Sequence, residues 1–371
     1  MTPSFSISIG GTDVTGNLND RLVSLIVTDA EGKQSDTVEI QLDDRNGEIA
    51  IPKKGALMSV AMGYRETGLQ PMGMFTVDEV EATGYPMTLT IRGKAADMRE
   101  DLKKPRTGYW DKKTLQDIMN DIAGRNGLSG ASVSQSLASF IYEYLPQTEE
   151  SDLHFITRLA RKHDAVAKPA NGKLLFTKKG EAQSASGQSM GAAVVTKDKV
   201  IDYSCQMRDR PAVKKVLSTY WDQKKAERVI VEKEGDSDVG PDYEMLHAQA
   251  NEDEAGADAQ STIDAQARDQ GSLSISIVGN PSIGAEMTLA VIGVRSGVDG
   301  AWRVKSAQHQ LDGRGYTTII DAEYPGAAGK AAADQATGGD GTSTGDIPGG
   351  TGGDSVPPTD LDFGGYGVPE L

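Results

Sequence analysis

The amino-acid sequence predicts an α+β protein that is mainly β, with two similar barrel-like β domains, an α/β insert between them and a flexible C-terminal tail. Three observations support this fold class. Apolar and polar residues alternate in short runs through the first hundred residues and again from about 205 to 325, as in half-buried strands. Near Trp110 the apolar period changes to about 3.6, as in a helix. After Pro325 the periodicity ends and small or polar residues dominate.

These changes define the expected domain boundaries. We expect a first β domain at 1–104, an α/β insert at 105–204, a second β domain at 205–325 and a Gly-rich flexible tail at 326–371. Of the 371 residues, 37% are hydrophobic. This proportion is enough to give each folded domain a buried core.

In the first β domain, apolar residues occupy alternate positions of several short segments. Phe5–Ile9 and Val38–Leu42 each place an apolar side chain at every second position. Turn-forming residues separate such runs, for example Gly10-Gly11 and Asp43-Asp44-Arg45-Asn46-Gly47. The pattern predicts antiparallel strands with one buried face.

The second β domain repeats features of the first in the same order. Five pairs of segments agree in order and approximate spacing: Lys54-Gly55 with Ile283-Gly284, Leu57–Ala61 with Met287–Val291, Gly73–Val77 with Gly300–Val304, Gly84-Tyr85 with Gly315-Tyr316, and Thr88–Ile91 with Thr317–Ile320. We interpret this agreement as a degenerate internal repeat of one barrel-like unit.

The insert contains two predicted amphipathic helices and a hairpin. The first helix has an apolar stripe from Leu115 to Ala123. In the second helix Thr148 is the expected N-cap, and acidic residues in the first turn with basic residues in the last suit the helix dipole. Asn171-Gly172 fits a type I′ turn and predicts a hairpin at about 165–176. The expected buried stripe of the second helix comprises Leu153, Ile156, Leu159 and Ala160.

Two later segments are poor in large apolar residues. From Tyr243 to about Arg268, abundant Ala and Gln predict a solvated helix. In the tail, Leu361–Val368 regains apolar groups. This segment is either plain tail or a partner-docking peptide.

Composition argues against several functions. A formal net charge of −16 repels phosphate backbones, so we expect no specific nucleic-acid binding. The single cysteine, Cys205, cannot form an internal disulfide, and the four histidines form no zinc-like cluster. The chain starts without a signal-peptide pattern, and no stretch is apolar enough to cross a bilayer. We therefore expect a soluble protein without membrane association, made in the cytoplasm.

Candidate catalytic groups have simpler structural explanations. Glu150, Asp152 and His154 lie close together, but no second histidine follows at metal-ligand spacing, and acidic residues suit the start of a helix. Cys205 has no neighbouring histidine or basic helix start that would lower its pKa. The sequence contains no nucleophile elbow, Walker loop or dinucleotide fingerprint. We expect no enzymatic activity, no cofactor and no metal.

The insert resembles the signature of a known family. Trp110–Ala123, Gln147, Glu150–Ala160 and Gly172–Gly180 are similar to the core of the phage late-control gene D protein family. Proteins of this family are contractile-tail baseplate hubs, related to the hub part of type VI secretion spike proteins. With the flanking β regions, the resemblance covers about seven-eighths of the chain. The residues that carry the signature, all expected to be structural, are Trp110, Leu115, Ile118, Glu150, Ser151, Asp152, Phe155, Leu159, Ala160 and Gly172.

The resemblance implies a structural hub in the virion tail baseplate or in a phage-tail-like particle. It implies a homotrimeric ring that adapts the sixfold tail tube to the threefold central spike, with two barrels per chain giving six around the ring. The implied partners are the central spike protein, the tail tube or tube-initiator protein, the tape-measure protein and baseplate wedge proteins, with DNA passing through the lumen. A tail-associated cell-wall hydrolase and a receptor-binding β protein are the alternative functions. Whether the particle is a complete phage or a headless device stays open.

Overall fold

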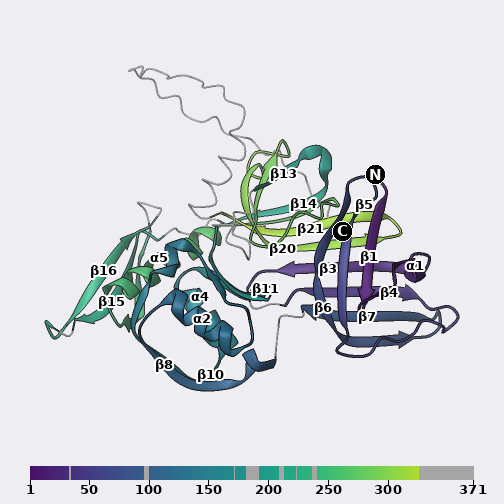
Figure 1. Cartoon of the computed structure of the whole chain (residues 1–371). Coiled ribbons are helices and arrows are strands. Elements are labelled where there is room, and N and C mark those ends of the chain that lie inside the picture. The colour runs from purple at the N-terminus through teal and green to yellow at the C-terminus, as the bar shows by residue number, and fades with distance from the viewer. Residues whose placement is uncertain are drawn as a thin grey trace, which may run out of the picture. The chain divides into compact units, whose positions relative to one another are not determined.

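The structure is a computed structural model that describes residues 1–32, 35–95, 100–170, 172–180, 192–208, 213–222, 224–235 and 240–325, with backbone alone at 100 and 101. The expected tail at 326–371, its segment Leu361–Val368 and Asn171 of the expected turn lie outside these residues. The described part contains a 13-stranded sheet, three smaller sheets and a few helices (Figure 1), which confirms the predicted α+β, mainly β class.

The first half of the large sheet comes from residues 1–95. Leu25 and Val27 on one strand, and Ile40 and Leu42 on its neighbour, occupy every second position and are buried in one core. The alternation predicted from the sequence therefore places one face of these strands against the core. The elements are β1 (Pro3–Ile9), β2 (Thr12–Asp13), α1 (Thr15–Leu18), β3 (Leu22–Ala30), β4 (Thr37–Asp43), β5 (Leu57–Tyr64), β6 (Gly68–Thr83) and β7 (Thr88–Ala95).

The second half of the sheet has a separate core that contains Ile275, Leu289, Trp302 and Ile320. Its elements are β13 (Ala192–Thr196), the 3₁₀ helix η2 (Lys197–Lys199), β14 (Val200–Met207), β18 (Gly271–Val278), β19 (Thr288–Ile292), β20 (Gly300–Asp312) and β21 (Gly315–Glu323). β13 and most of β14 precede residue 205, where we expected the second domain to begin. They hydrogen-bond to β19 and β18 of this half.

The two halves form one sheet because β3 pairs with β20 (Figure 1). The pairing is antiparallel and runs from Ala30 opposite Ser306 to Ser24 opposite Asp312. Leu311 and Tyr316 from the second half pack into the core of the first half. The junction therefore has both backbone pairing and shared apolar burial.

The two halves have the same strand order. The first reads β3-β4-β7-β6-β5-β1, and the second reads β14-β18-β21-β20-β19-β13. If the six strands of each half are numbered in chain order, both halves read second, third, sixth, fifth, fourth, first across the sheet. One pair differs in direction, because β1 is antiparallel to β5 whereas β13 is parallel to β19.

The registers of the two halves also agree. Counting along the paired strands, β6 and β20 correspond with an offset of 227 residues, since Val77 lies opposite Gly93 and Val304 lies opposite Ala322. β3 and β14 correspond with an offset of 178 residues, since Thr28 and Gln206 hold equivalent places. Irregularities fall at equivalent positions: at Leu22/Ser24 and Val200/Asp202, and at Val77/Glu79 and Val304/Ser306. A bulge changes the direction of the following side chains, so shared bulges preserve the facing of whole strands.

Part of the sequence alignment was wrong. The counterpart of Gly55 is Glu286 and not Gly284, because the amide of Gly55 donates to Val77 and that of Glu286 donates to Val304, each at 2.8 Å. Both residues have a positive φ, +82° for Gly55 and +72° for Glu286. This conformation favours glycine, so a glutamate there disguised the match. The same register places Tyr316 at the position of Met87 and not of Tyr85. The pairs Gly73–Val77 with Gly300–Val304 and Thr88–Ile91 with Thr317–Ile320 keep the alignment made from the sequence.

The insert folds around two helices, and β8 and β10 curve around them in Figure 1. The first predicted helix is confirmed as α2 and the predicted hairpin as β11 and β12, which pair antiparallel. Thr148 is not the N-cap of the second helix, because the chain stays in β10 as far as Ser151, whose hydroxyl accepts from the His154 amide. The elements are η1 (Glu100–Lys103), β8 (Pro105–Thr114), α2 (Leu115–Arg125), β9 (Ala131–Val133), α3 (Gln135–Ala138), β10 (Ile141–Ser151), α4 (Asp152–Lys162), β11 (Ala165–Ala170) and β12 (Lys173–Lys178).

A further unit lies in sequence between β14 and β18. It has a three-stranded sheet and a helix: β15 (Lys215–Asp222), β16 (Glu227–Glu234), β17 (Asp242–Gln249) and α5 (Glu252–Arg268). The expected start of the helix at Tyr243 was wrong, because this segment pairs with β15, and Asn251 caps the helix that follows. The helix is only partly solvated, since it buries Ala259 and Ile263. Within the described residues, no helix has the length and apolar character to cross a membrane.

Candidate functional site

The ten signature residues all lie in the insert, where an aromatic stack forms the centre of the core. The rings of Trp110 on β8 and Phe155 on α4 stack with centroids 4.8 Å apart. The guanidinium of Arg125 lies 5.3 Å from the Trp110 ring. A cation beside an aromatic face is attracted by the ring quadrupole. The stack therefore connects β8 with α4, and Arg125 adds a contact from α2.

Asp152 is fully buried and is the centre of a polar network. Its carboxylate accepts from Arg125 Nε at 2.9 Å, from Asn126 Nδ2 at 2.7 Å and from Gln147 Nε2 at 2.8 Å. A second bond from Arg125 makes the ion pair bidentate. Both carboxylate oxygens of Asp152 accept hydrogen bonds from neighbouring side chains, and neither is accessible to a substrate. The group therefore holds elements of the insert together.

The other signature residues pack or cap around this centre. Ser151 caps α4, and Glu150 forms an ion pair with Arg158 and lies 3.0 Å from Nδ1 of His154. The carbonyl of Gly172 accepts from the amide of Ser129 at 2.8 Å. Four apolar signature residues are buried in the same cluster: Leu115, Ile118, Leu159 and Ala160.

Sequence reasoning missed a buried hydrogen bond between Tyr142 and His163. The phenol oxygen lies 2.6 Å from His163 Nε2. Burial lowers the pKa of His163 to about 4, and Lys162 and Lys178 add to this effect. The imidazole is therefore neutral at pH 7. No local pattern marks this pair, because its members lie on either side of α4 in the sequence.

A second missed cluster joins the insert to both halves of the sheet. Lys168 on β11 lies 3.1 Å from Asp29 and 3.9 Å from each of Asp36 and Glu286. Burial raises the pKa of Asp36 to about 7; the charge of Lys168 opposes this rise and that of Asp29 adds to it. Asp29 belongs to the first half of the sheet, and Glu286 precedes β19 of the second. One lysine thus contacts both halves.

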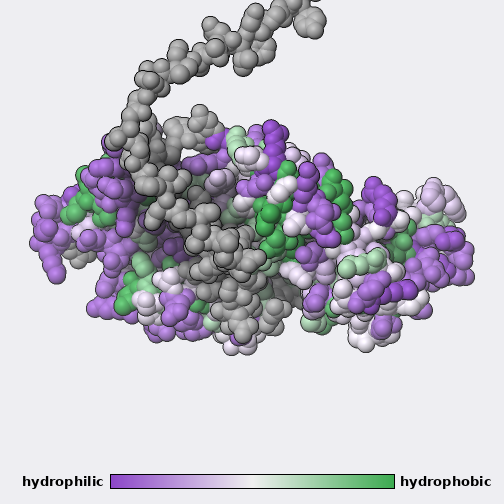
Figure 2. All heavy atoms as spheres, turned by 90° about the horizontal axis from the view of Figure 1, so that it is seen from above, coloured by the Kyte–Doolittle hydropathy of each residue, from purple (hydrophilic) through white to green (hydrophobic). Residues whose placement is uncertain are grey.

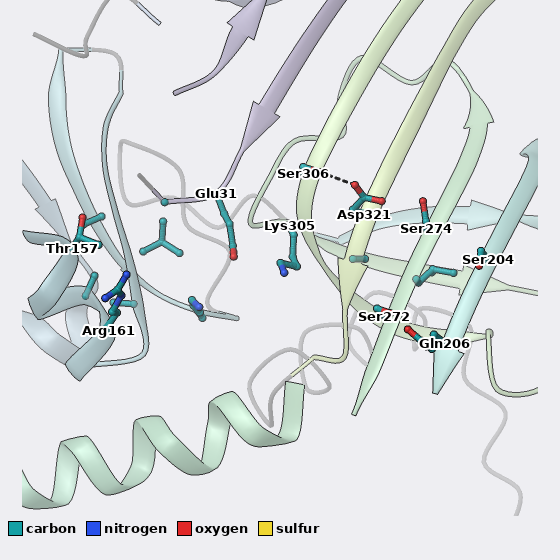
Figure 3. A pocket seen from close by; sticks show the side chains of 18 residues that line it. Glu31, Thr157, Arg161, Ser204, Gln206, Ser272, Ser274, Lys305, Ser306 and Asp321 are labelled. Carbon is teal, nitrogen blue, oxygen red and sulfur yellow. Dashed lines mark hydrogen bonds between the residues drawn. The ribbon is translucent and has the colours of Figure 1, made fainter. Parts of the chain in front are cut away.

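A cavity of about 710 Å³ lies between the insert and the sheet (Figure 3). Thr157 and Arg161 of α4 line one side, and Ser204, Ser272 and Ser274 of the sheet line the other. Its polar lining combines five hydroxyl groups with an equal number of charged side chains, which are Glu31, Arg161, Lys179, Lys305 and Asp321. Nowhere in the described part of the chain do three or more His, Cys, Asp or Glu side chains form a group that could hold a metal ion.

A family model described as the phage tail baseplate hub matches residues 64–314, a range that includes the whole insert and most of the sheet. The chain belongs to the phage tail baseplate hub family. Over 362 residues it is 31% identical to the probable baseplate hub protein of Escherichia phage P2, covering 87% of this chain and 93% of that relative. The resemblance inferred from the insert signature is confirmed.

Solved structures share the fold of this hub protein. The 43 kDa tail protein of prophage MuSo2 from Shewanella oneidensis has a TM-score of 0.65 at 16% identity, covering 87% of this chain and 99% of the other. A component of the type VI secretion system from E. coli has a TM-score of 0.54 at 9% identity, covering 89% and 80%. The protein is a structural component of the tail baseplate of a phage or phage-like particle, and it is not an enzyme.

Proposed function

We propose that the hub is a homotrimeric ring that adapts the sixfold tail tube to the threefold central spike. The observation that supports this proposal is the repeated strand order with equivalent registers and bulges in one chain. Three such chains around an axis present six nearly equivalent sheet halves to one neighbour. The same three chains present three inserts to another neighbour.

The face of the sheet opposite the two cores suits the lining of a channel. Gln41, Gln308 and Thr317 are at least partly accessible on this face, since they alternate along their strands with buried residues. Neutral hydroxyl and amide groups do not bind a polyanion tightly, because they carry no positive charge. We infer that DNA or an extended tape-measure protein passes along this face.

Charged side chains on the same face have an acidic balance. Arg92 forms ion pairs with Glu39, Glu79 and Glu81. One guanidinium therefore balances only one of three carboxylates. Together with the net charge of −16, this acidity repels DNA from the wall and allows it to slide.

The proposed partners follow from the position in the tail. The sixfold arrangement of halves contacts the tail tube or tube-initiator protein, and the other end of the ring contacts the central spike. The tape-measure protein and baseplate wedge proteins complete the set. Synthesis in the host cytoplasm precedes assembly in this proposal.

Native mass measurement and electron-microscope projections along the particle axis test the proposal. We expect a mass of three chains and six similar densities around the axis of the hub layer. A chain that remains monomeric in assembled tails excludes the ring. Cell-wall hydrolysis by the purified protein favours the hydrolase, and glycan binding without affinity for tail components favours the receptor-binding protein.

A further inference from the structure

The junction between β3 and β20 is a strand-to-strand contact between the two halves of the repeat. Inward-facing side chains on both strands are buried there: Leu25 and Val27 from β3, and Ala307 and His309 from β20. Because the halves are equivalent in register, each of these two strands has a counterpart elsewhere in the chain. The counterparts are β14 for β3 and β6 for β20.

Neither counterpart has the partner that this equivalence predicts. β14 ends the strand order of the large sheet and pairs only with β18. On β6, Val77 exchanges hydrogen bonds with Gly55 and Ala56, just as Val304 does with Glu286 and Met287. Beyond that point residues 79–83 of β6 pair only with β7, whereas residues 306–310 of β20 also pair with β3. In the described part of the chain, two matching strand edges are therefore open.

Apolar side chains on these edges are more exposed than their counterparts at the junction. Tyr203 on β14 corresponds to Leu25, and it is 36% exposed whereas Leu25 is fully buried. Met207 near the end of the same strand is 55% exposed. The space-filling view of Figure 2 shows a mainly hydrophilic surface with separate hydrophobic patches. An open strand edge with apolar side chains is a ready site for pairing with another chain.

We propose that β14 of one subunit pairs antiparallel with residues 79–83 of β6 in the next subunit, reproducing between chains the β3–β20 pairing within a chain. The proposal rests on the ring proposed above and specifies its contact. Transferring the β3–β20 register places Glu79 opposite Arg208 and Ala82 opposite Cys205. The first pair has opposite charges, and the second joins two small side chains.

The contact is head-to-tail, because each subunit uses a different edge toward each neighbour. Such contacts close into a ring when the rotation between subunits completes a circle. Around a ring of three subunits, three β3–β20 junctions within chains would then alternate with three β14–β6 junctions between chains. The occupant of each open edge is thus a second copy of this chain.

The lone cysteine offers a direct test. Residues directly opposite each other in an antiparallel pair have Cα atoms about 4.5 to 5.5 Å apart, a separation that a disulfide can span. In the Ala82→Cys variant, we expect mild oxidation to produce covalently linked trimers on a non-reducing gel. The matched control is Glu81→Cys, which places an exposed thiol one residue away on the other face of the strand. A second control, Ala82→Cys with Cys205→Ser, lacks the partner thiol.

Native mass measured on the same samples separates this inference from the ring itself. A native trimer that forms no covalent trimer with Ala82→Cys, or links equally well with Glu81→Cys, overturns the strand contact and leaves the ring standing. A chain that is monomeric both alone and in assembled tails overturns both proposals. Covalent trimers specific to Ala82→Cys support both.

A charge exchange tests the register without a disulfide. Both Glu79 and Arg208 are exposed in the single chain, and the contact of Glu79 with Arg92 is the longest of the three that Arg92 makes, at 3.6 Å. We therefore expect substitutions at both positions to leave the fold intact. We expect Glu79→Arg and Arg208→Glu each to weaken trimer formation several-fold at low salt, and the double variant to restore it. No recovery in the double variant contradicts the predicted pairing of these two residues.

Discussion

Tyr64 and Gly279 are joined across the junction of the two sheet halves, because the Tyr64 hydroxyl donates to the Gly279 carbonyl at 2.8 Å. The residues are 215 positions apart in the sequence. The Tyr64 ring also lies 5.5 Å from that of Tyr316, which comes from the second half. One side chain therefore contributes both a hydrogen bond and apolar burial to the joint.

We expect Tyr64→Phe to lower the free energy of unfolding by about 0.5 to 1.5 kcal/mol, because it leaves a buried carbonyl without its donor. The ring and its packing are retained, so the effect isolates the hydroxyl. Urea denaturation followed by tryptophan fluorescence measures the change. Tyr85→Phe is the control, since Tyr85 is 94% exposed. Equal effects of the two substitutions contradict a role for the hydroxyl at the junction.

Leu159→Ala is expected to cost about 2 to 5 kcal/mol of stability, because it opens a cavity in the insert core. Leu159 is fully buried among the signature residues. Leu246→Ala is the matched control, since that leucine is 90% exposed. Equilibrium unfolding of both variants measures the difference. A loss below about 1 kcal/mol at Leu159 is inconsistent with the packing described for α4.

The pKa of Asp36 predicts a pH dependence of stability. The folded-state pKa is raised to about 7 from an ordinary value of 3.8. Between these two values the folded chain holds a proton that the unfolded chain has lost, so this group makes stability fall as pH rises toward 7. Below pH 4 both states are protonated and the contribution no longer changes.

The Asp36→Asn variant keeps a neutral side chain of similar shape at every pH. We compare the free energy of unfolding of this variant with that of the unmodified protein. As the pH rises from 5 to 8, we expect the difference to change by roughly 1 to 3 kcal/mol in favour of the variant, because each pKa unit crossed contributes about 1.4 kcal/mol. The lowered pKa of His163 makes stability rise with pH, but it does so equally in the variant and in the unmodified protein. The difference between the two proteins at each pH therefore does not contain this contribution. Unfolding curves at the two pH values measure the gain, and an unchanged difference rules out a protonated Asp36 in the folded state.

Several local elements could be predicted from the sequence because their signals lie within a few residues. The apolar stripe from Leu115 to Ala123 is buried on α2, and the hairpin at 165–176 forms as β11 and β12. The spacing of apolar residues reflects the geometry of one element against one core. The end of a helix depends on competing contacts: β10 continues to Ser151, and this pairing with β8 moved the cap away from Thr148.

The sequence located the candidate site in the insert, but it did not predict which side chains contact one another there. The sequence identified Asp152 as a helix-start residue, but its bonds to Arg125 and Gln147 depend on two other elements. Lys168 appears in the sequence as an ordinary strand residue, and only the packing of the insert on the sheet places it beside Asp29 and Glu286. Charge pairing between distant segments leaves no periodic trace.

By itself, the sequence determined the mainly β composition, the helix-containing insert, the family and the matching segments Gly73–Val77 and Gly300–Val304. Only the tertiary structure decided that β3 and β20 join the halves and that Glu286 occupies the place of Gly55. The reason is physical: alternation and helical period report on which face of one element is buried. Strand partners are chosen by register and shared burial between segments hundreds of residues apart.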